Sequence, residues 1–418
     1  MPGNKLMLGY MTTIKRYQKK SFPIDTLEEM QPLFNAVAHG CAADLHQQAL
    51  EEVYYPRIQR DGITNFLSSK LGAFSDDLAV VTHFFTAPWH TPAAGLGENE
   101  QAGVLNWAGF RLRAMGRLRE ALQPMQANVD MSVQQENWIE AALGASNLSE
   151  LQLDLGNVAA AVASGQQSVS YADQSEDGFQ RMGKRSTHAD ALHQAGEKAQ
   201  ALERFIEAEQ IQQEQQPENP RLYSLAGFRY CNLLLKQDTI AVLERAEYAL
   251  ALSEKYLGKG LGLHDIALDK LTLGRAHYLQ GDFPQAIDRL DQAVTGLRQA
   301  GTRHHLPRGL LARAALNCDT HNPNHDFTHA RQDLQEVYDI AEPSSMRLHL
   351  TDYHLEMARL LLAEREGGVK SPEEVDGRKA LTLDEHVAEA ARLIDATGYN
   401  RRLPELQELQ RQLDLPVS

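Results

Sequence analysis

The fold of this chain is decided by residues 99–125, which read NEQAGVLNWAGFRLRAMGRLREALQPM. In the first half, small and apolar residues spaced three or four positions apart form one face of a helix: Leu105, Ala108, Gly109 and Leu112. Gly116 interrupts that helix, and a second helix follows with Leu118, Ala121 and Met125 on its apolar face. Small residues allow two helices to approach closely, while Leu and Met fill the groove between them. The stretch therefore predicts a hairpin of two packed helices.

The same hairpin pattern returns along the chain at nearly constant spacing. The position of Ala121 recurs, least clearly at its last copy, in Ala121, Ala161, Ala201, Val242, Ala286, Ala330 and Ala388. The steps between successive copies are 40, 40, 41, 44, 44 and 58 residues. Such a period is typical of stacked two-helix units, none of which can bury its apolar face alone. We therefore expect an all-α fold: a right-handed α-solenoid of tetratricopeptide-like hairpins with an open concave trough and almost no strand.

This pattern divides the chain into four parts. They are a basic leader (1–25), an N-terminal helical unit with a non-repeat insertion (26–97), the repeat array (98–400) and a C-terminal capping helix (401–418). The insertion at 61–97 is rich in Gly and Pro around the apolar stretch 78–85. We expect one extra helix there and an ordered loop that ends at Trp89.

The charge of the chain argues against a nucleic-acid partner. The net charge is −15, although residues 1–20 contain five basic residues and no acidic one. An acidic body repels phosphates, so we expect no nucleic-acid partner. The leader is expected to be solvated, either disordered or the end of a neighbouring domain, rather than a nucleic-acid-binding arm.

The cysteines and the hydropathy pattern indicate a cytoplasmic protein. The three cysteines are far apart and offer neither a disulfide framework nor a CxxC metal pair. No apolar run reaches the length of about 18 residues that a membrane span needs, and the N-terminus lacks the apolar core of a secretion signal. We expect no membrane partner.

Several phrases resemble the tetratricopeptide region of bacterial signal-transduction ATPases of the STAND and NACHT type. They are AVAHGC (36–41), KLGAF (70–74), ASNLSEL (145–151), ADALHQAG (189–196) and LPRGLLARA (306–314). The resemblance covers the chain from about residue 27 and implies a sensing arm that regulates a nucleotide-binding switch. The phosphate-binding motif GxxxxGK[ST] is absent, and Gly258-Lys259-Gly260 has the wrong spacing for it. The implied nucleotide-binding effector would therefore be a separate protein or a fused domain outside this sequence.

The first helix of each unit should build the concave wall, so polar and aromatic residues recurring there are the candidates for binding a partner. They are Asn106, Phe110, Arg113, Glu150, Asp190, His193, Arg229, Arg275, Tyr278, Arg308, Arg313 and Asp352. The alternative is that these residues form a wetted groove with local ion pairs.

We therefore expect a non-catalytic solenoid that binds a protein or peptide in its groove and acts as a sensor or adaptor, without cofactor or metal. His325 and His329 have the i, i+4 spacing of zinc ligands, but Asn and Pro neighbours favour a loop. His304 and His305 could act as a base, but the sequence places no nucleophile beside them. A structural scaffold that self-associates through its ends or the insertion is the main alternative, and an enzyme with an unrecognised site is another.

Overall fold

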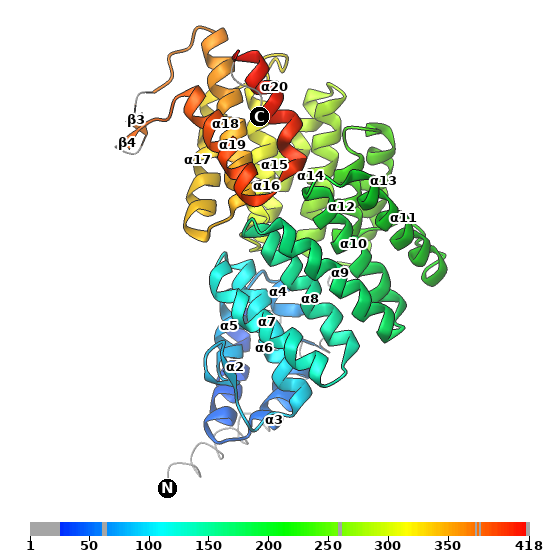
Figure 1. Cartoon of the computed structure of the whole chain (residues 1–418). Coiled ribbons are helices and arrows are strands. Elements are labelled where there is room, and N and C mark those ends of the chain that lie inside the picture. Colours follow the sequence, from blue (N-terminus) through cyan, green and yellow to red (C-terminus); the bar gives the residue numbers. More distant parts are fainter. Residues whose placement is uncertain (1–25, 61–64, 258–260, 373, 376–377, 415–418) are drawn as a thin grey trace.

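The computed structural model describes residues 26–60, 65–257, 261–372, 374–375 and 378–414, so the expected basic leader 1–25 lies outside the described residues. The protein is an all-α solenoid of helical hairpins, as expected from the repeat (Figure 1). Its successive hairpins are α6 (Glu98–Ala114) with α7 (Leu118–Gln134), α8 (Trp138–Asp154) with α9 (Val158–Ser175), α10 (Gly178–Gln194) with α11 (Lys198–Gln215), α12 (Ser224–Leu234) with α13 (Thr239–Lys255), α14 (Leu263–Leu279) with α15 (Phe283–Gln299), α16 (Leu306–Cys318) with α17 (Phe327–Ser344), and α18 (Arg347–Glu366) with α19 (Leu383–Thr397).

Glycines in the left-handed conformation make the tight turns between the paired helices. Gly116 and Gly281 have φ values of 79° and 75°, which cost a residue with a Cβ atom about 1–2 kcal/mol. Each turn sends the chain back along its own first helix, so the first helices stack on one another from α6 through α18. This stack forms the inner row of the solenoid.

The N-terminal unit consists of short elements that pack against α6. Its bounds are α2 (Leu27–Ala42), α3 (His46–Ala49), the π-helical segment η1 (Leu50–Ile58), α4 (Phe66–Ser69), α5 (Phe74–Thr82), β1 (Phe85–Ala87) and β2 (Thr91–Pro92). The insertion holds two helices, α4 and α5, where one was expected, and Trp89 lies in the turn between β1 and β2 instead of ending a loop. Helix α5 begins at Phe74, earlier than the apolar stretch 78–85 suggested. The reason is that Asp77 is fully buried and accepts hydrogen bonds from Arg111 at 2.5 Å and Tyr54 at 2.8 Å. Because its carboxylate is hydrogen-bonded, Asp77 can be buried in the turn of helix that precedes the apolar run.

The insertion also contacts the middle of the array. A Cβ atom added at Gly72 would lie 2.6 Å from the carbonyl oxygen of Gln299, and one at Gly301 would lie 2.5 Å from that of Gly72. The backbone amide of Arg303 donates to the carbonyl oxygen of Ala114 at 2.9 Å. The insertion is therefore held between α6 and the loop that joins α15 to α16.

The C-terminal end folds back onto the first hairpins instead of leaving the trough open. Beyond α19 lie a short 3-10 turn, η2 (Asn400–Arg402), and α20 (Leu403–Gln412). Figure 1 shows the chain curving away through α13 and returning, so that α18 lies beside α8. An added Cβ atom at Gly156 would meet Cβ of Arg347 at 2.6 Å, and one at Gly196 would meet Asn400 at 3.1 Å. The expected trough is thus closed, because the curvature of the array brings its two ends together.

Strands are minor, as expected. The hairpin β1–β2 belongs to the insertion, and β3 (Glu374–Val375) with β4 (Arg378–Lys379) lies in the segment between α18 and α19. Within the described ranges, no helix is both long and apolar enough to cross a membrane.

The packing of the insertion on the loop between α15 and α16 can be tested with a pair of glycines that have the same conformation. Gly301→Ala should cost the left-handed strain of about 1–2 kcal/mol plus about 1–3 kcal/mol for overpacking against Gly72. Gly281→Ala has the same strain but open space around the new methyl group, so it should cost only the first part. Urea unfolding measures both losses, and equal losses would contradict the packing of residues 72 and 301.

Candidate functional site

Four of the candidate residues form one buried ion network across the inner row. Arg113 of α6 donates to Glu150 at 2.6 Å and to Asp154 at 2.7 Å, both on α8. Arg229 of α12 reaches Glu150 at 2.6 Å and lies 3.6 Å from Asp190 of α10. These candidate residues therefore lie close together on neighbouring first helices, but they pair with one another.

The electrostatics of this network favour full ionisation. Burial would raise the pKa of Glu150, but Arg229 and Arg113 outweigh burial and hold its pKa at about 2. All four residues are at least nine-tenths buried. Because their charges are satisfied internally, the network links four first helices and leaves little for a ligand to contact.

Three of the other candidates also have partners within the protein, and a fourth is buried. Asn106 accepts a hydrogen bond from Asn147 at 2.8 Å, and Phe110, which is partly exposed, packs on Phe74 with ring centroids 6.2 Å apart. Arg313 pairs with Asp333 at 2.7 Å and Asp291 at 2.9 Å, contacts made toward α17 and α15. His193 is buried, and its pKa is lowered by burial and by the nearby Arg401 and Arg402.

The remaining four candidates line a central cavity of about 500 Å³. Arg275 and Tyr278 come from α14, Arg308 from α16 and Asp352 from α18. Further wall residues come from α8, α10 and α12, and residues 399–405 close one side. We call η2 and α20, residues 400–412, the C-terminal clasp. The cavity is therefore walled by six first helices and the clasp.

The clasp is attached to the inner row by polar contacts. Arg401 donates to Gln194 at 3.1 Å and to Asn232 at 3.0 Å. Arg402 pairs with Asp352 at 2.7 Å, and Lys236 pairs with Glu405 at 2.8 Å. The clasp thus contacts α10, α12 and α18 together.

Sequence reasoning missed the clasp residues, and it missed Asn232. The repeat pattern ends before residue 401, so periodicity assigned this segment to a cap. The adjacent pair Arg401-Arg402 at the start of a short amphipathic helix was the one local signal for its role. Asn232 gave no signal, because a single amide on an inner helix is common.

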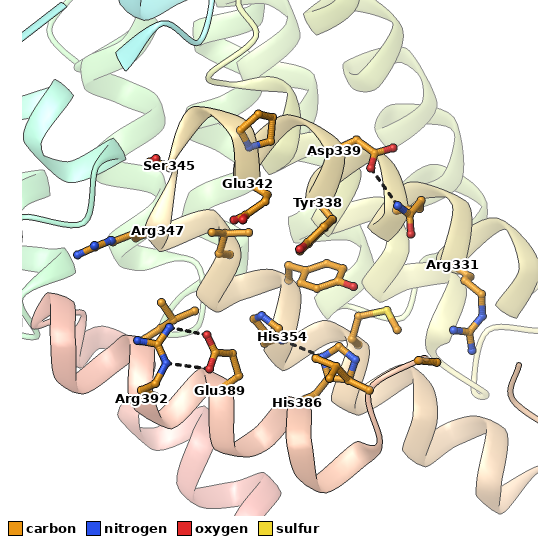
Figure 2. Close-up of a pocket in the computed structure, with 18 of the residues that line it drawn as sticks. Arg331, Tyr338, Asp339, Glu342, Ser345, Arg347, His354, His386, Glu389 and Arg392 are labelled. Carbon is orange, nitrogen blue, oxygen red and sulfur yellow. Dashed lines mark hydrogen bonds and ion pairs between the residues drawn. The ribbon is translucent and has the colours of Figure 1, made fainter. Parts of the chain in front are cut away.

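A second, larger hollow of about 1060 Å³ lies between α17, α18 and α19. Figure 2 shows that Arg331, Tyr338 and Glu342 reach it from α17, His354 from α18, and His386 and Glu389 from α19. Three of its charged side chains are paired, since Arg331 contacts Glu364 at 2.6 Å and Arg392 contacts Glu389 at 2.5 Å.

A pair of histidines lies in this second hollow. Nδ1 of His354 is 2.8 Å from Nδ1 of His386, so one ring donates and the other accepts. Burial lowers the pKa of His354 to about 4 and that of His386 to about 3, and the neighbouring His354 adds to the second shift. Both rings are therefore neutral near pH 7.

The histidines that were considered as zinc ligands or as a base either bind other groups or are buried. His321 lies 2.8 Å from Asp319, and Nδ1 of His325 lies 3.0 Å from the carbonyl oxygen of Asn322. In the described part of the chain, no three metal-ligating side chains gather into a possible metal site. His304 and His305 are both buried, and burial lowers the pKa of each.

The buried ion network should be far more sensitive to substitution than a surface pair. Glu150→Gln leaves Arg229 and Arg113 short of a carboxylate and should lower the free energy of unfolding by about 3–5 kcal/mol. Glu120→Gln removes the exposed pair with Arg117 at 2.6 Å and should cost no more than about 1 kcal/mol. Chemical denaturation measures both, and similar losses would show that the network contributes nothing special.

The buried histidines predict that acid destabilises the fold. An unfolded histidine takes up a proton near its ordinary pKa of about 6.5, whereas His354 and His386 do so only at about 4 and about 3. The unfolded state then binds more protons between these values, so the free energy of unfolding falls as pH is lowered from about 6.5 to 4.

Thermal unfolding at a series of pH values measures this slope. His386→Gln should reduce it without abolishing it, because other histidines are buried as well. His321→Gln, at a side chain that is 88% exposed, should leave the slope unchanged. A melting temperature that is flat between pH 6.5 and 4.5 would contradict the prediction.

Comparison with known proteins identifies no family for this chain. No family model matches the sequence, and no curated protein is similar to it. Among solved structures, it is similar to a Rap protein complexed with competence and sporulation factor, with a TM-score of 0.48 and 14% identity over 75% of this chain and 82% of that one. It is also similar to a STAND protein with a tetratricopeptide repeat sensor from Pyrococcus horikoshii, with a TM-score of 0.45 and 12% identity over 96% of this chain. The matched region is 54% of that protein's length, so this chain spans about half of it.

Proposed function

We propose that this protein is a non-catalytic solenoid that binds a peptide, or an extended segment of a protein, in its central cavity and reports occupancy to a signalling partner. The observation that carries the proposal is the cavity between the inner row and the clasp. Its volume of about 500 Å³ lies within the range of about 300–1,000 Å³ typical of ligand pockets. It suits the end of a chain or a short segment, whereas a folded domain would not enter.

The position of the cavity favours a sensor or adaptor. An occupant would contact α14, α16 and α18 on one side and the clasp on the other. A ligand that contacts both sides binds the state with the clasp attached more tightly than a state with the clasp detached, so it stabilises the attached state. Occupancy would thereby change the end of the solenoid, where a separate or fused effector could detect it.

The chemistry of the cavity wall supports binding more than catalysis. Cys318 is the cysteine that lines it, and burial raises the pKa of this thiol far above its ordinary value. A protonated thiol is a poor nucleophile. Glu405, on the clasp side of the wall, is also unsuited to proton transfer, because Arg402 and Arg359 outweigh its burial and lower its pKa strongly.

The proposal can be tested by filling the cavity. Ala315 lines it from α16, and Ala315→Phe would occupy the space with little change elsewhere. Ala159→Phe adds the same ring at an exposed position of α9 and serves as the matched control. Peptides selected from a random displayed library against the wild type should lose binding to Ala315→Phe and keep it with Ala159→Phe.

A second measurement tests the sensor role. A selected peptide should slow backbone hydrogen exchange in residues 400–412 as well as in the inner row, because the clasp closes over the cavity. Peptides that bind Ala315→Phe as well as wild type would overturn the proposed site. Protection that is confined to the inner helices would overturn the proposed coupling to the clasp.

A further inference from the structure

Three arginines meet in the central cavity without a carboxylate partner. Arg275 donates to Oδ1 of Asn232 at 3.0 Å, and Arg401 donates to the same oxygen at 3.0 Å. Arg308 lies over the ring of Phe228, 5.7 Å from its centroid, and its buried Nε makes no hydrogen bond. Among the described residues, no acidic side chain lies within ion-pair distance of these three guanidinium groups. One neutral amide oxygen therefore serves two of the three cations.

The acidic residues in the cavity wall already have other partners. Asp154 pairs with Arg113, Asp352 with Arg402, Glu356 with Arg359, and Glu405 with Arg402 and Lys236. Asp319 accepts hydrogen bonds from the hydroxyl of Tyr278 at 3.0 Å and from the backbone of His321 at 2.9 Å. Asp352 and Glu405 thus offset part of the positive charge of Arg275 and Arg401 from a distance, but the wall forms no direct ion pair with these two arginines or with Arg308.

This arrangement is electrostatically unfavourable when the cavity holds only water. Burial and the nearby Arg401, Arg402 and Arg308 lower the pKa of Arg275 to about 9. The pKa of Arg401 is lowered by burial and by Arg402. A guanidinium group remains protonated at neutral pH, so the like-charge repulsion persists. The three side chains are partly buried. Charges drawn out of water are stabilised by a counter-charge, so an anion from outside the chain would be favoured here.

We propose that Arg275, Arg308 and Arg401 bind an oxyanion carried by the ligand, either a carboxylate or a phosphate group. The three side chains come from α14, α16 and η2, so they line the cavity from the inner row and from the clasp. Planar guanidinium groups match both oxyanions through paired N–H donors. The anion neutralises the repulsion and holds the clasp against the array. That the anion is part of a peptide ligand rests on the proposed function, whereas the preference for an oxyanion rests on the three arginines.

The first experiment uses the purified protein and simple anions. Inorganic phosphate, succinate and sodium chloride are titrated at constant ionic strength, with calorimetry and the melting temperature as readouts. Phosphate, succinate or both should bind and raise the melting temperature, while chloride should not. The stronger of the two distinguishes a phosphate-bearing ligand from a carboxylate-bearing one. Failure of both oxyanions to bind, or equal stabilisation by chloride, would overturn the proposal.

Matched variants separate a binding role from a structural one. Arg275→Gln should weaken oxyanion binding by roughly 30-fold or more. It should leave the melting temperature of the empty protein unchanged or raised, because it relieves repulsion from Arg401 and Arg308. Arg313→Gln removes an arginine paired with Asp333 outside the cavity and should leave anion binding intact. An Arg275→Gln protein that melts lower and binds anions like the wild type would assign Arg275 a purely structural role.

These outcomes are distinguishable from failure of the proposed function. Oxyanion binding that depends on Arg275, in a protein that selects no peptide, would retain the anion site and reject the peptide ligand. Peptides that bind in the cavity with equal affinity to the wild type and to Arg275→Gln would retain the peptide ligand and reject the anion site. Selected peptides with a free C-terminal carboxylate and with an amide in its place complete the comparison.

Discussion

The shape of this protein depends on close contacts between parts of the chain that lie far apart in the sequence. At Gly72 and Gly301, and at Gly156 beside Arg347, there is no room for an additional Cβ atom. The angle between successive hairpins can vary slightly, so contacts between distant parts of the chain set the final curvature of the array. The inner row then encloses a small cavity where a straighter stack would present a long open groove. The location of the cavity, and the side chains that reach it, follow from this closure.

Much of the fold could be predicted because it is encoded locally. The turn glycines, the small residues at Ala121 and its repeats, and the spacing of the apolar positions each specify one hairpin and its neighbour. The structure brings Glu150 and Asp190, which share a repeat position, close to Arg229, which does not. The repeat register could not show that these side chains neutralise one another, since the partner of each charge depends on rotamers and on the angle between successive hairpins. The start of α5 escaped prediction for a similar reason, because the burial of Asp77 depends on Arg111, 34 residues later.

The clasp and its arginines could not be found from periodicity. The contact of Arg401 with Asn232 joins residues 169 positions apart, and it exists only because small rotations accumulate over the units between them. No local sequence pattern specifies the total rotation between distant repeats. Arg275 and Arg308 were chosen as candidates for their position on first helices, but their common lack of an acidic partner became visible only in three dimensions.

The long-range contacts of the clasp also change how this solenoid should fold and come apart. A linear repeat array is stabilised by nearest neighbours, so a terminal repeat can fray while the others persist. Here Arg401 contacts Gln194 across 207 residues, and Lys236 contacts Glu405 across 169. Closing so long a loop costs conformational entropy, and this cost becomes small only after the intervening hairpins have formed. The last step of folding therefore depends on nearly all the earlier ones, which gives a modular chain the cooperativity of a single globular domain.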